Sequence, residues 1–224
     1  MKLLLIRHGE SQGNAENIFQ GQGDWPLSDL GRAQARCLAV RLAAEFESIS
    51  AIYTSTLSRA LETAHILAQA TGAPIIPDER LTEYDVGQLT GLTLEQVEQR
   101  FPEVGAAWKA DHGEWVMPPG GETYEHFWKR VRDVFAEIAA RHVEDDYVAV
   151  VSHGGTLGTY LCQAMGIPPG RRSPFSFGNA CLTIVDLSRQ RPRLRQHNDG
   201  CHLNGARDAT SLEPEQTLRR KPDL

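Results

Sequence analysis

Hydrophobic residues follow two kinds of spacing along this chain. Short, nearly unbroken apolar runs are typical of buried strands, whereas an apolar residue at every third or fourth position is typical of an amphipathic helix. We expect strands at residues 3–6, 51–54, 74–76, 147–151, 180–185 and 193–196. Helical spacing fills much of the chain between them. Because strands alternate with helices, the pattern predicts an α/β fold with a largely parallel central sheet.

Several of the expected helices have recognisable ends. Ser28 is a suitable N-cap for a helix whose apolar positions are 30, 33, 37, 40 and 44. A capping box at residues 93–96 begins a short helix that Pro102 is expected to end. Further helices are expected at about 57–71, 122–142 and 156–165. The helix at 122–142 is expected to be the longest, and its aromatic and aliphatic stripe is most simply explained as core.

Two parts of the chain depart from this alternation. Residues 82–121 are rich in Gly, Pro and Trp and poor in strand-like runs, so we expect an inserted lid over one sheet edge. Residues 205–224 contain few hydrophobic residues and mixed charge, which predicts a flexible C-terminal tail. The expected organisation is a single domain over residues 1–204, followed by that tail.

Composition and charge exclude several functional classes. The 224 residues are 41% hydrophobic and 23% charged, close to globular averages of about 45–50% and 25%. No apolar run is long enough for a bilayer span or a secretory signal, so no membrane association is expected. A net charge of −6 disfavours a general nucleic-acid surface. The scattered cysteines predict mostly buried free thiols in a reducing cytoplasm, and they are Cys37, Cys162, Cys181 and Cys201.

Histidines stand where two of the predicted strands end. Arg7, His8 and Gly9 follow the first strand, and His153 with Gly154-Gly155 follows the strand at 147–151. Ligands of open α/β sheets bind outside the carboxyl ends of the strands. Free N–H groups at a helix N-terminus also suit an anion. The two strand ends together predict an anion-binding site.

Two further segments could complete such a site. Arg59 lies in the first turn of a predicted helix, where its charge opposes the helix dipole unless an anion lies nearby. A guanidinium can also hold phosphate oxygens in a bidentate way. Glu83 and Asp85 lie in the loop-rich region, and either could supply an acid, because the spacing alone does not choose between them.

Two other kinds of site are disfavoured. Residues 9–13 match the G-x-S-x-G nucleophile elbow around Ser11, but almost no chain lies upstream to supply the oxyanion hole of a serine esterase. His197, Cys201 and His202 cluster without the spacing of zinc ligands, so no metal site is expected.

Taken together, these segments resemble the histidine phosphatase superfamily, in its phosphoglycerate-mutase-like branch. The likeness covers about residues 3 to 190. The motifs that carry it are Arg7-His8-Gly9-Glu10-Ser11 with Asn14, Gln20-Gly21, Pro26-Leu27-Ser28, the segment 55–64 around Arg59, and Ser152-His153-Gly154-Gly155. The resemblance implies a three-layer α/β/α sandwich with a largely parallel central sheet and a helical lid insertion.

The resemblance also implies roles for these residues. The acid of the family stands in an L-x-E-x-x-x-G context, which falls on Glu83. His8 would attack phosphorus as a neutral imidazole, and Glu83 would protonate the leaving group and then activate water. The residues expected to hold the phosphate are Arg7, Asn14, Gln20, Gly21, Arg59, Glu83, His153, Gly154 and Gly155. Leu89 and Thr90 replace a more usual Trp-Glu pair, which bears on substrate preference.

Three functions follow from the resemblance. The first is a broad-specificity phosphatase that acts on a small phosphorylated metabolite without a metal, because arginines take its place. The second is a phosphoglycerate mutase that needs 2,3-bisphosphoglycerate for priming, and the third is a catalytically inactive phospho-ligand or protein-binding module. Residues 92–121 carry only Arg100 and Lys109 as cations against five acids, whereas such mutases use basic residues there to grip a carboxylate. This favours the phosphatase, and the retained His8, Arg59 and Glu83 disfavour the inactive module. A homodimer is plausible for the family.

Overall fold

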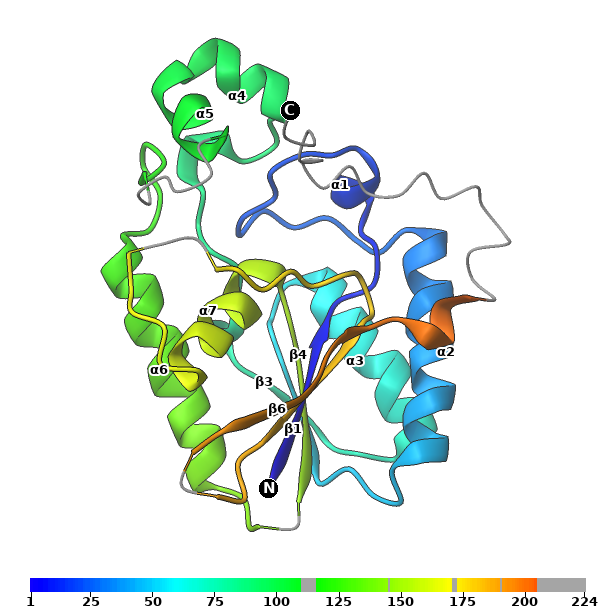
Figure 1. Ribbon diagram of the computed structural model, residues 1–224. Coiled ribbons are helices and arrows are strands. Elements are labelled where there is room, and N and C mark those ends of the chain that lie inside the picture. Colours follow the sequence, from blue (N-terminus) through cyan, green and yellow to red (C-terminus); the bar gives the residue numbers. More distant parts are fainter. Residues whose placement is uncertain (110–115, 145, 171–172, 190, 205–224) are drawn as a thin grey trace, which may run out of the picture.

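The computed structural model describes residues 1–109, 116–144, 146–170, 173–189 and 191–204. The tail expected at 205–224 lies outside the described residues. A six-stranded sheet with the order β3-β2-β4-β1-β5-β6 forms the centre (Figure 1). Its strands are β1 (Lys2–Arg7), β2 (Ala51–Thr54), β3 (Ile75–Pro77), β4 (Tyr147–Ser152), β5 (Leu182–Asp186) and β6 (Arg193–Asp199). The first four are mutually parallel, β5 pairs antiparallel with β1, and β6 antiparallel with β5.

Helices cover both faces of the sheet. The α-helices are α1 (Gln12–Ala15), α2 (Asp29–Glu45), α3 (Ser58–Thr71), α4 (Leu94–Arg100), α5 (Pro102–Lys109), α6 (Tyr124–Ala140) and α7 (Gly154–Ala164). Short 3-10 helices are η1 (Glu79–Leu81), η2 (Gly87–Leu89) and η3 (Cys201–Leu203). Helices α2 and α3 pack on one face and α6 and α7 on the other (Figure 1). The three-layer sandwich expected from the resemblance is thereby confirmed.

Strand β1 shows why the central strands are apolar throughout. Leu3 and Leu5 belong to the core beneath α6 and α7, whereas Leu4 and Ile6 belong to the core beneath α2 and α3. All four side chains are fully buried. A strand that is buried on both faces needs apolar residues at every position rather than at alternate ones.

The stripe expected on α2 is wrong. Val40, placed in that stripe, is 70% exposed, and position 44 is also exposed. The helix instead buries Gly31, Gln34, Ala35, Leu38, Ala39 and Leu42. This face combines a glycine, small residues and a polar side chain whose Oε1 accepts a hydrogen bond from Glu10 N. Apart from Leu38 and Leu42, the positions of this face do not stand out on hydrophobicity, so the spacing selected a neighbouring face.

The inserted region is more helical than expected. Pro102 does not merely end α4 but begins α5, since proline suits the first turn of a helix, where no backbone N–H partner is needed. The capping box at Thr93 is present. Both helices lie beyond the carboxyl ends of the parallel strands (Figure 1), as an inserted helical lid would.

Other element ends differ slightly from expectation. Helix α6 shares its length of 17 residues with α2. Helix α7 begins two residues earlier than predicted, with His153 as its N-cap. None of the four cysteines, all within the described chain, forms a disulfide, and only Cys162 and Cys181 are buried. Within the described ranges, no helix combines the length and the hydrophobicity that a membrane crossing requires.

Candidate active site

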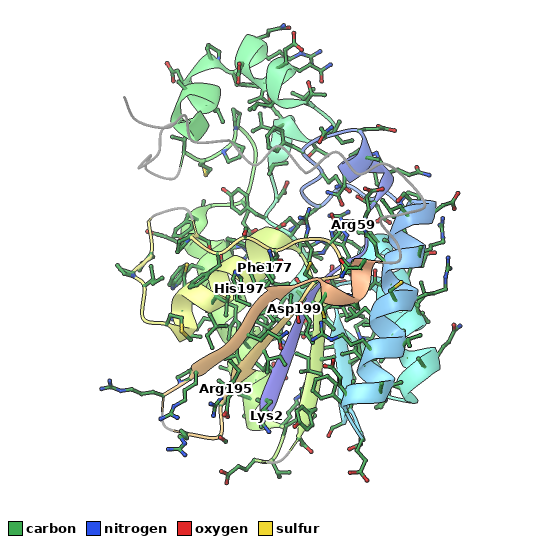
Figure 2. All side chains as sticks on the ribbon, turned by 45° about the vertical axis from the view of Figure 1, so that its right-hand side comes forward. Lys2, Arg59, Phe177, Arg195, His197 and Asp199 are labelled. Atoms are coloured by element: carbon green, nitrogen blue, oxygen red, sulfur yellow. The ribbon has the colours of Figure 1, made fainter. Side chains whose placement is uncertain are left out.

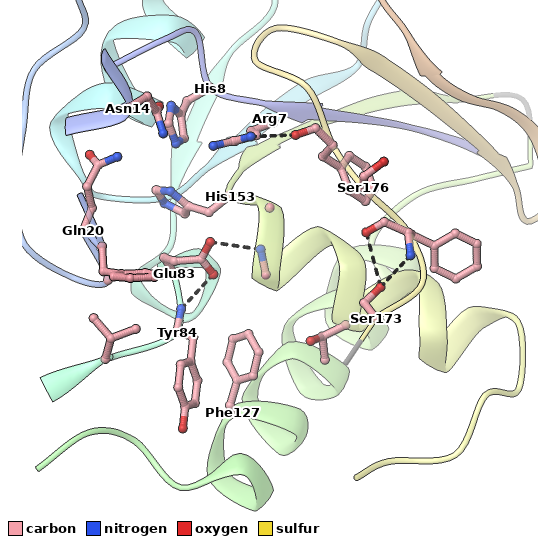
Figure 3. Close-up of a pocket in the computed structure, with 18 of the residues that line it drawn as sticks. Arg7, His8, Asn14, Gln20, Glu83, Tyr84, Phe127, His153, Ser173 and Ser176 are labelled. Carbon is pink, nitrogen blue, oxygen red and sulfur yellow. Dashed lines mark hydrogen bonds between the residues drawn. The ribbon is translucent and has the colours of Figure 1, made fainter. Parts of the chain in front are cut away.

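One cavity of about 580 Å³ opens at the carboxyl ends of β1 and β4. The predicted nucleophile and all nine residues expected to hold the phosphate line it, namely His8, Arg7, Asn14, Gln20, Gly21, Arg59, Glu83, His153, Gly154 and Gly155. Figure 3 shows His8, Glu83 and His153 pointing into it. They come from segments far apart in the sequence, and the sheet brings them together. The structure therefore gathers the predicted residues into one place, while the roles assigned to them stay predictions.

The two histidines meet because β1 and β4 are neighbouring parallel strands. Arg7 is in register with Ser152, so the residue after each strand emerges at the same edge. The His8 and His153 rings lie 5.0 Å apart between centroids, at 61° to each other. Both side chains are almost completely buried.

His8 has one ring nitrogen engaged by the backbone. Its Nδ1 lies 2.6 Å from the carbonyl oxygen of Gly9, and because a carbonyl can only accept, Nδ1 carries the proton. The lone pair of Nε2 is then available. Burial, followed by the charges of Arg7 and Arg59, lowers the pKa of His8 well below its usual value. His8 is therefore a neutral imidazole at neutral pH.

His153 and Arg59 bring further polar groups to the cavity. His153 Nε2 lies 2.8 Å from Ser55 Oγ, and burial, with the nearby His8, lowers its pKa well below the usual value. Arg59 donates from Nη1 to Gly23 O at 2.7 Å and from Nη2 to Gly21 O at 2.8 Å. Burial lowers the pKa of Arg59 to about 10, so it remains charged at neutral pH.

Two of these side chains keep a buried polar atom without a protein partner. Arg59 Nε and His153 Nδ1 have no hydrogen-bond partner among the described residues. Buried polar atoms are nearly always hydrogen-bonded in folded proteins, and exceptions often mark functional positions. The exceptions here fall in the cavity that the strand-end motifs predicted.

Ser11 organises one wall of the cavity but does not line it. Its hydroxyl caps α1 by accepting from Asn14 N, and it lies 2.9 Å from Asn14 Oδ1 and 2.8 Å from Gln20 Oε1. With their oxygens so engaged, Asn14 and Gln20 turn their amide nitrogens toward the cavity (Figure 3). Because Ser11 is fully buried and committed to these contacts, the arrangement of a serine-esterase elbow is absent from this segment.

Glu83 occupies the N-terminus of α7. Its Oε2 accepts from Gly155 N at 2.9 Å, and its Oε1 from Thr156 N at 3.2 Å and Tyr84 N at 2.8 Å. This differs from the expectation that the Gly155 amide faces phosphate, since that N–H serves the carboxylate instead. Asp85 does not line the cavity, and its Oδ1 accepts from Gly87 N. Of the two candidate acids, the structure brings Glu83 to the site.

The loop that follows α7 lines the cavity although no sequence motif indicated it. Ser173, Phe175, Ser176 and Phe177 line the cavity, and the Phe177 carbonyl accepts from Arg7 Nη1 at 2.7 Å. His197 of β6 packs against this wall, with its ring centroid 5.5 Å from that of Phe175 and 5.3 Å from that of Phe177. Figure 2 labels Phe177 and His197 next to each other. The mixed aromatic and hydroxyl sequence of this loop matches no chemical motif, so nothing in it indicated a role.

Charge in the cavity is confined to one end. Among its described lining residues, only Arg7, Arg59 and Glu83 carry charged side chains. The other lining residues are uncharged and include several aromatic and hydroxyl side chains. Among them, Tyr84 and Phe127 lie beside each other (Figure 3), at 5.0 Å between ring centroids. No group of three or more potential metal ligands (His, Cys, Asp or Glu) was found in the part of the chain that the structure describes.

Comparison with known proteins adds an independent line of information. The family model of the histidine phosphatase superfamily (branch 1) matches residues 3–200. Phosphoserine phosphatase 1 of Hydrogenobacter thermophilus is 32% identical over 209 residues, covering 91% of this chain and 94% of the relative. The metal-independent phosphoserine phosphatase of Arabidopsis thaliana is also 32% identical, over 91% and 83% of the two chains.

Mutases are similar at comparable identity. The 2,3-bisphosphoglycerate-dependent phosphoglycerate mutase of Cytophaga hutchinsonii is 31% identical over 90% of both chains. Among solved structures, Bacillus stearothermophilus YhfR superposes with a TM-score of 0.78 at 31% identity, covering 90% of this chain and 98% of that one.

Proposed function

Because this chain belongs to branch 1 of the histidine phosphatase superfamily, we propose that it hydrolyses small phosphomonoesters through a phosphohistidine on His8, without a metal. That it is a phosphoric monoester hydrolase agrees with relatives named as phosphatases. The observation that carries the mechanism is the geometry of His8. Its Nδ1–H is held by the Gly9 carbonyl, so Nε2 faces the cavity as a neutral nucleophile.

The phosphate group binds at the charged end of the cavity. A phosphomonoester is nearly dianionic at pH 7, and Arg7 and Arg59 supply two positive charges there. His153, Asn14 and Gln20 add hydrogen-bond donors around the equatorial oxygens. Groups that are already in place before the reaction stabilise the transition state without reorganisation.

Phosphoryl transfer then takes place in two steps. In the first, Nε2 of His8 forms a bond to phosphorus while the bond to the leaving oxygen breaks, and Glu83, which enters this step as the carboxylic acid, gives that oxygen its proton and becomes a carboxylate. In the second, Glu83 takes a proton from water, and the water oxygen displaces His8 from phosphorus. The product is inorganic phosphate, and both side chains return to their starting states.

The wall beyond the phosphate favours an uncharged alcohol portion in the substrate. A substrate carboxylate needs a cation, and the described lining residues provide none beyond Arg7 and Arg59. Tyr84, Phe127 and Phe175 offer ring surface instead, and Ser173 and Thr159 offer hydroxyls. This also favours hydrolysis over a mutase reaction, in which the enzyme must hold a glycerate carboxylate.

The first test measures phosphate release from p-nitrophenyl phosphate, 3-phosphoglycerate, phosphoserine and benzyl phosphate, all with excess EDTA. We expect EDTA-resistant release by the wild type, and a loss of at least about 100-fold in His8→Ala, because the nucleophile is absent. Near-wild-type turnover by His8→Ala would rule out the phosphohistidine. No release by the wild type, with isomerisation of 3-phosphoglycerate after priming by 2,3-bisphosphoglycerate, would identify a mutase. The absence of both activities would favour the binding module.

A further inference from the structure

Arg130 of α6 makes contacts that the proposed mechanism does not use. Its side chain is only 10% exposed. Its Nε and Nη2 donate to the two carboxylate oxygens of Glu122, at 2.7 and 2.8 Å. Nη1 donates to Arg80 O at 2.9 Å and Thr82 O at 2.8 Å, and Nη2 donates to Glu83 O at 2.9 Å. All five N–H groups of the guanidinium therefore have acceptors, and three of these are carbonyls of one short segment.

That segment is the one that carries the Glu83 carboxylate into the cavity. Side chains from three other elements bind its carbonyls in succession. Besides the three held by Arg130, Leu81 O accepts from Ser152 Oγ at 2.7 Å. Thr82 O also accepts from Thr156 Oγ1 at 2.8 Å. Glu83 itself lies outside the helices and strands, so side chains set its backbone position, and its carbonyl also accepts from Gln22 Nε2 at 3.2 Å.

Glu122 keeps Arg130 in place. Its side chain is 6% exposed, and although burial would raise its pKa, hydrogen bonds and charge from Arg130 lower the pKa below the usual value. Glu122 is therefore a carboxylate at neutral pH. Its own backbone joins the same loop, because Glu122 N donates to Asp85 O and Glu122 O accepts from the Tyr84 hydroxyl.

We propose that Arg130 is a positioning residue for the reaction, which sets the place of the Glu83 carboxylate by holding the carbonyls of residues 80, 82 and 83. The inference depends on the acid role proposed for Glu83. Only a planar guanidinium can reach three carbonyls and a carboxylate at once, since lysine presents a single compact charge. Removing the Arg130 guanidinium leaves the Glu83 carboxylate hydrogen-bonded to α7 but loosens the backbone of Glu83.

The test uses two substrates whose leaving groups differ in whether they need a proton. Ethyl phosphate leaves as a poor alkoxide that needs the proton from Glu83, whereas p-nitrophenolate leaves without one. We measure kcat/KM, which reports the phosphorylation step, for both substrates. General acid catalysis contributes about 10²- to 10⁴-fold. We therefore expect both Glu83→Gln and Arg130→Gln to lose at least about tenfold more activity on ethyl phosphate than on p-nitrophenyl phosphate.

A matched control is available at the other edge of the sheet. Arg195 of β6 also forms a two-pronged ion pair, with Asp186 Oδ2 at 3.1 and 2.7 Å, but it does not line the cavity. Arg195→Gln is expected to keep the wild-type ratio between the two substrates. A general loss of stability lowers both rates together and leaves this ratio unchanged.

The outcomes separate the two proposals. If Glu83→Gln changes the substrate ratio and Arg130→Gln does not, the positioning role is wrong and the acid role stands. If Glu83→Gln leaves the ratio unchanged, the acid role itself fails. Arg130→Lys keeps a positive charge beside Glu122, so it replaces Arg130→Gln in the test if that variant does not fold. We expect its ratio to shift in the same direction, and a wild-type ratio in Arg130→Lys overturns the proposal.

Discussion

Gly155 allows the placement of Glu83 to be perturbed by a single methyl group. A Cβ built on Gly155 would lie 2.5 Å from Glu83 Oε1, closer than side chains approach one another. A Cβ on the preceding Gly154 would have Arg7 Nε as its nearest neighbour, at 3.9 Å. The two neighbouring positions on one helix therefore differ in whether an alanine displaces the carboxylate.

The size of the effect follows from the distances. To restore a contact of about 3.0 Å, Oε1 must retreat from α7 by about 0.5 Å. The contact from Thr156 N, now 3.2 Å, would then exceed hydrogen-bond distance. A misplacement of about 1 Å costs roughly 10²-fold in rate, so half that distance predicts a loss of about tenfold, or about 1.4 kcal/mol in the barrier.

The assay is kcat/KM on ethyl phosphate, with the thermal midpoint of unfolding measured beside it. Gly155→Ala is expected to lose about tenfold without a matching loss of stability, because alanine favours a helix over glycine by roughly 0.5–1 kcal/mol. Gly154→Ala is expected to show the smaller loss of the two. Full activity in Gly155→Ala, or an equal loss in Gly154→Ala, would refute the placement of Glu83 against α7.

Two further predictions concern the buried cationic and imidazole groups. Burial lowers the pKa of His8 and His153 in the folded state, so below pH 6.5 unfolding takes up protons on both. The free energy of unfolding should therefore fall as pH drops from 6.5 toward the lowered pKa values of the folded state. Urea titrations at several pH values should show a weaker dependence of this free energy on pH in the double variant His8→Asn/His153→Asn. An unchanged slope would contradict the burial of neutral rings. Arg59→Lys cannot keep both hydrogen bonds to Gly21 O and Gly23 O. Steady-state kinetics should therefore show at least about a tenfold lower kcat/KM in this variant. Equal kcat/KM in the wild type and the variant would show that the planar guanidinium is not needed.

Much of the site could be predicted from the sequence because its chemistry lies next to local signals. His8 and His153 each follow an apolar run, and glycine follows each of them. The strand ends of a parallel sheet meet at one edge, so these residues had to lie near each other once the sheet was expected. Arg59, which follows the second strand, came from the same logic, whereas Glu83 was chosen over Asp85 only by the resemblance of its motif.

Other parts of the fold could not be predicted because the local sequence carries little information about them. The buried face of α2 uses Gly31 and Gln34, which hydrophobic spacing does not select. The loop at 173–177 contains no charged residue and no histidine, yet its Phe177 carbonyl accepts a hydrogen bond from Arg7. In the sequence, Arg130 is indistinguishable from an ordinary charged residue on the polar side of an amphipathic helix. Each depends on a partner that is distant along the chain.

The sequence by itself determined the alternation of strands and helices, the capping of α2 and α4, and the identity of the residues at the strand ends, because these depend on neighbours within a few positions. Only the tertiary structure decided that the Gly155 amide serves the Glu83 carboxylate and that Arg130 holds the loop behind it. A side chain's partner is set by where the packed layers bring other elements. Fifty residues separate Arg130 from Arg80 in the chain, and the spacing of residues carries no information about a contact at that range.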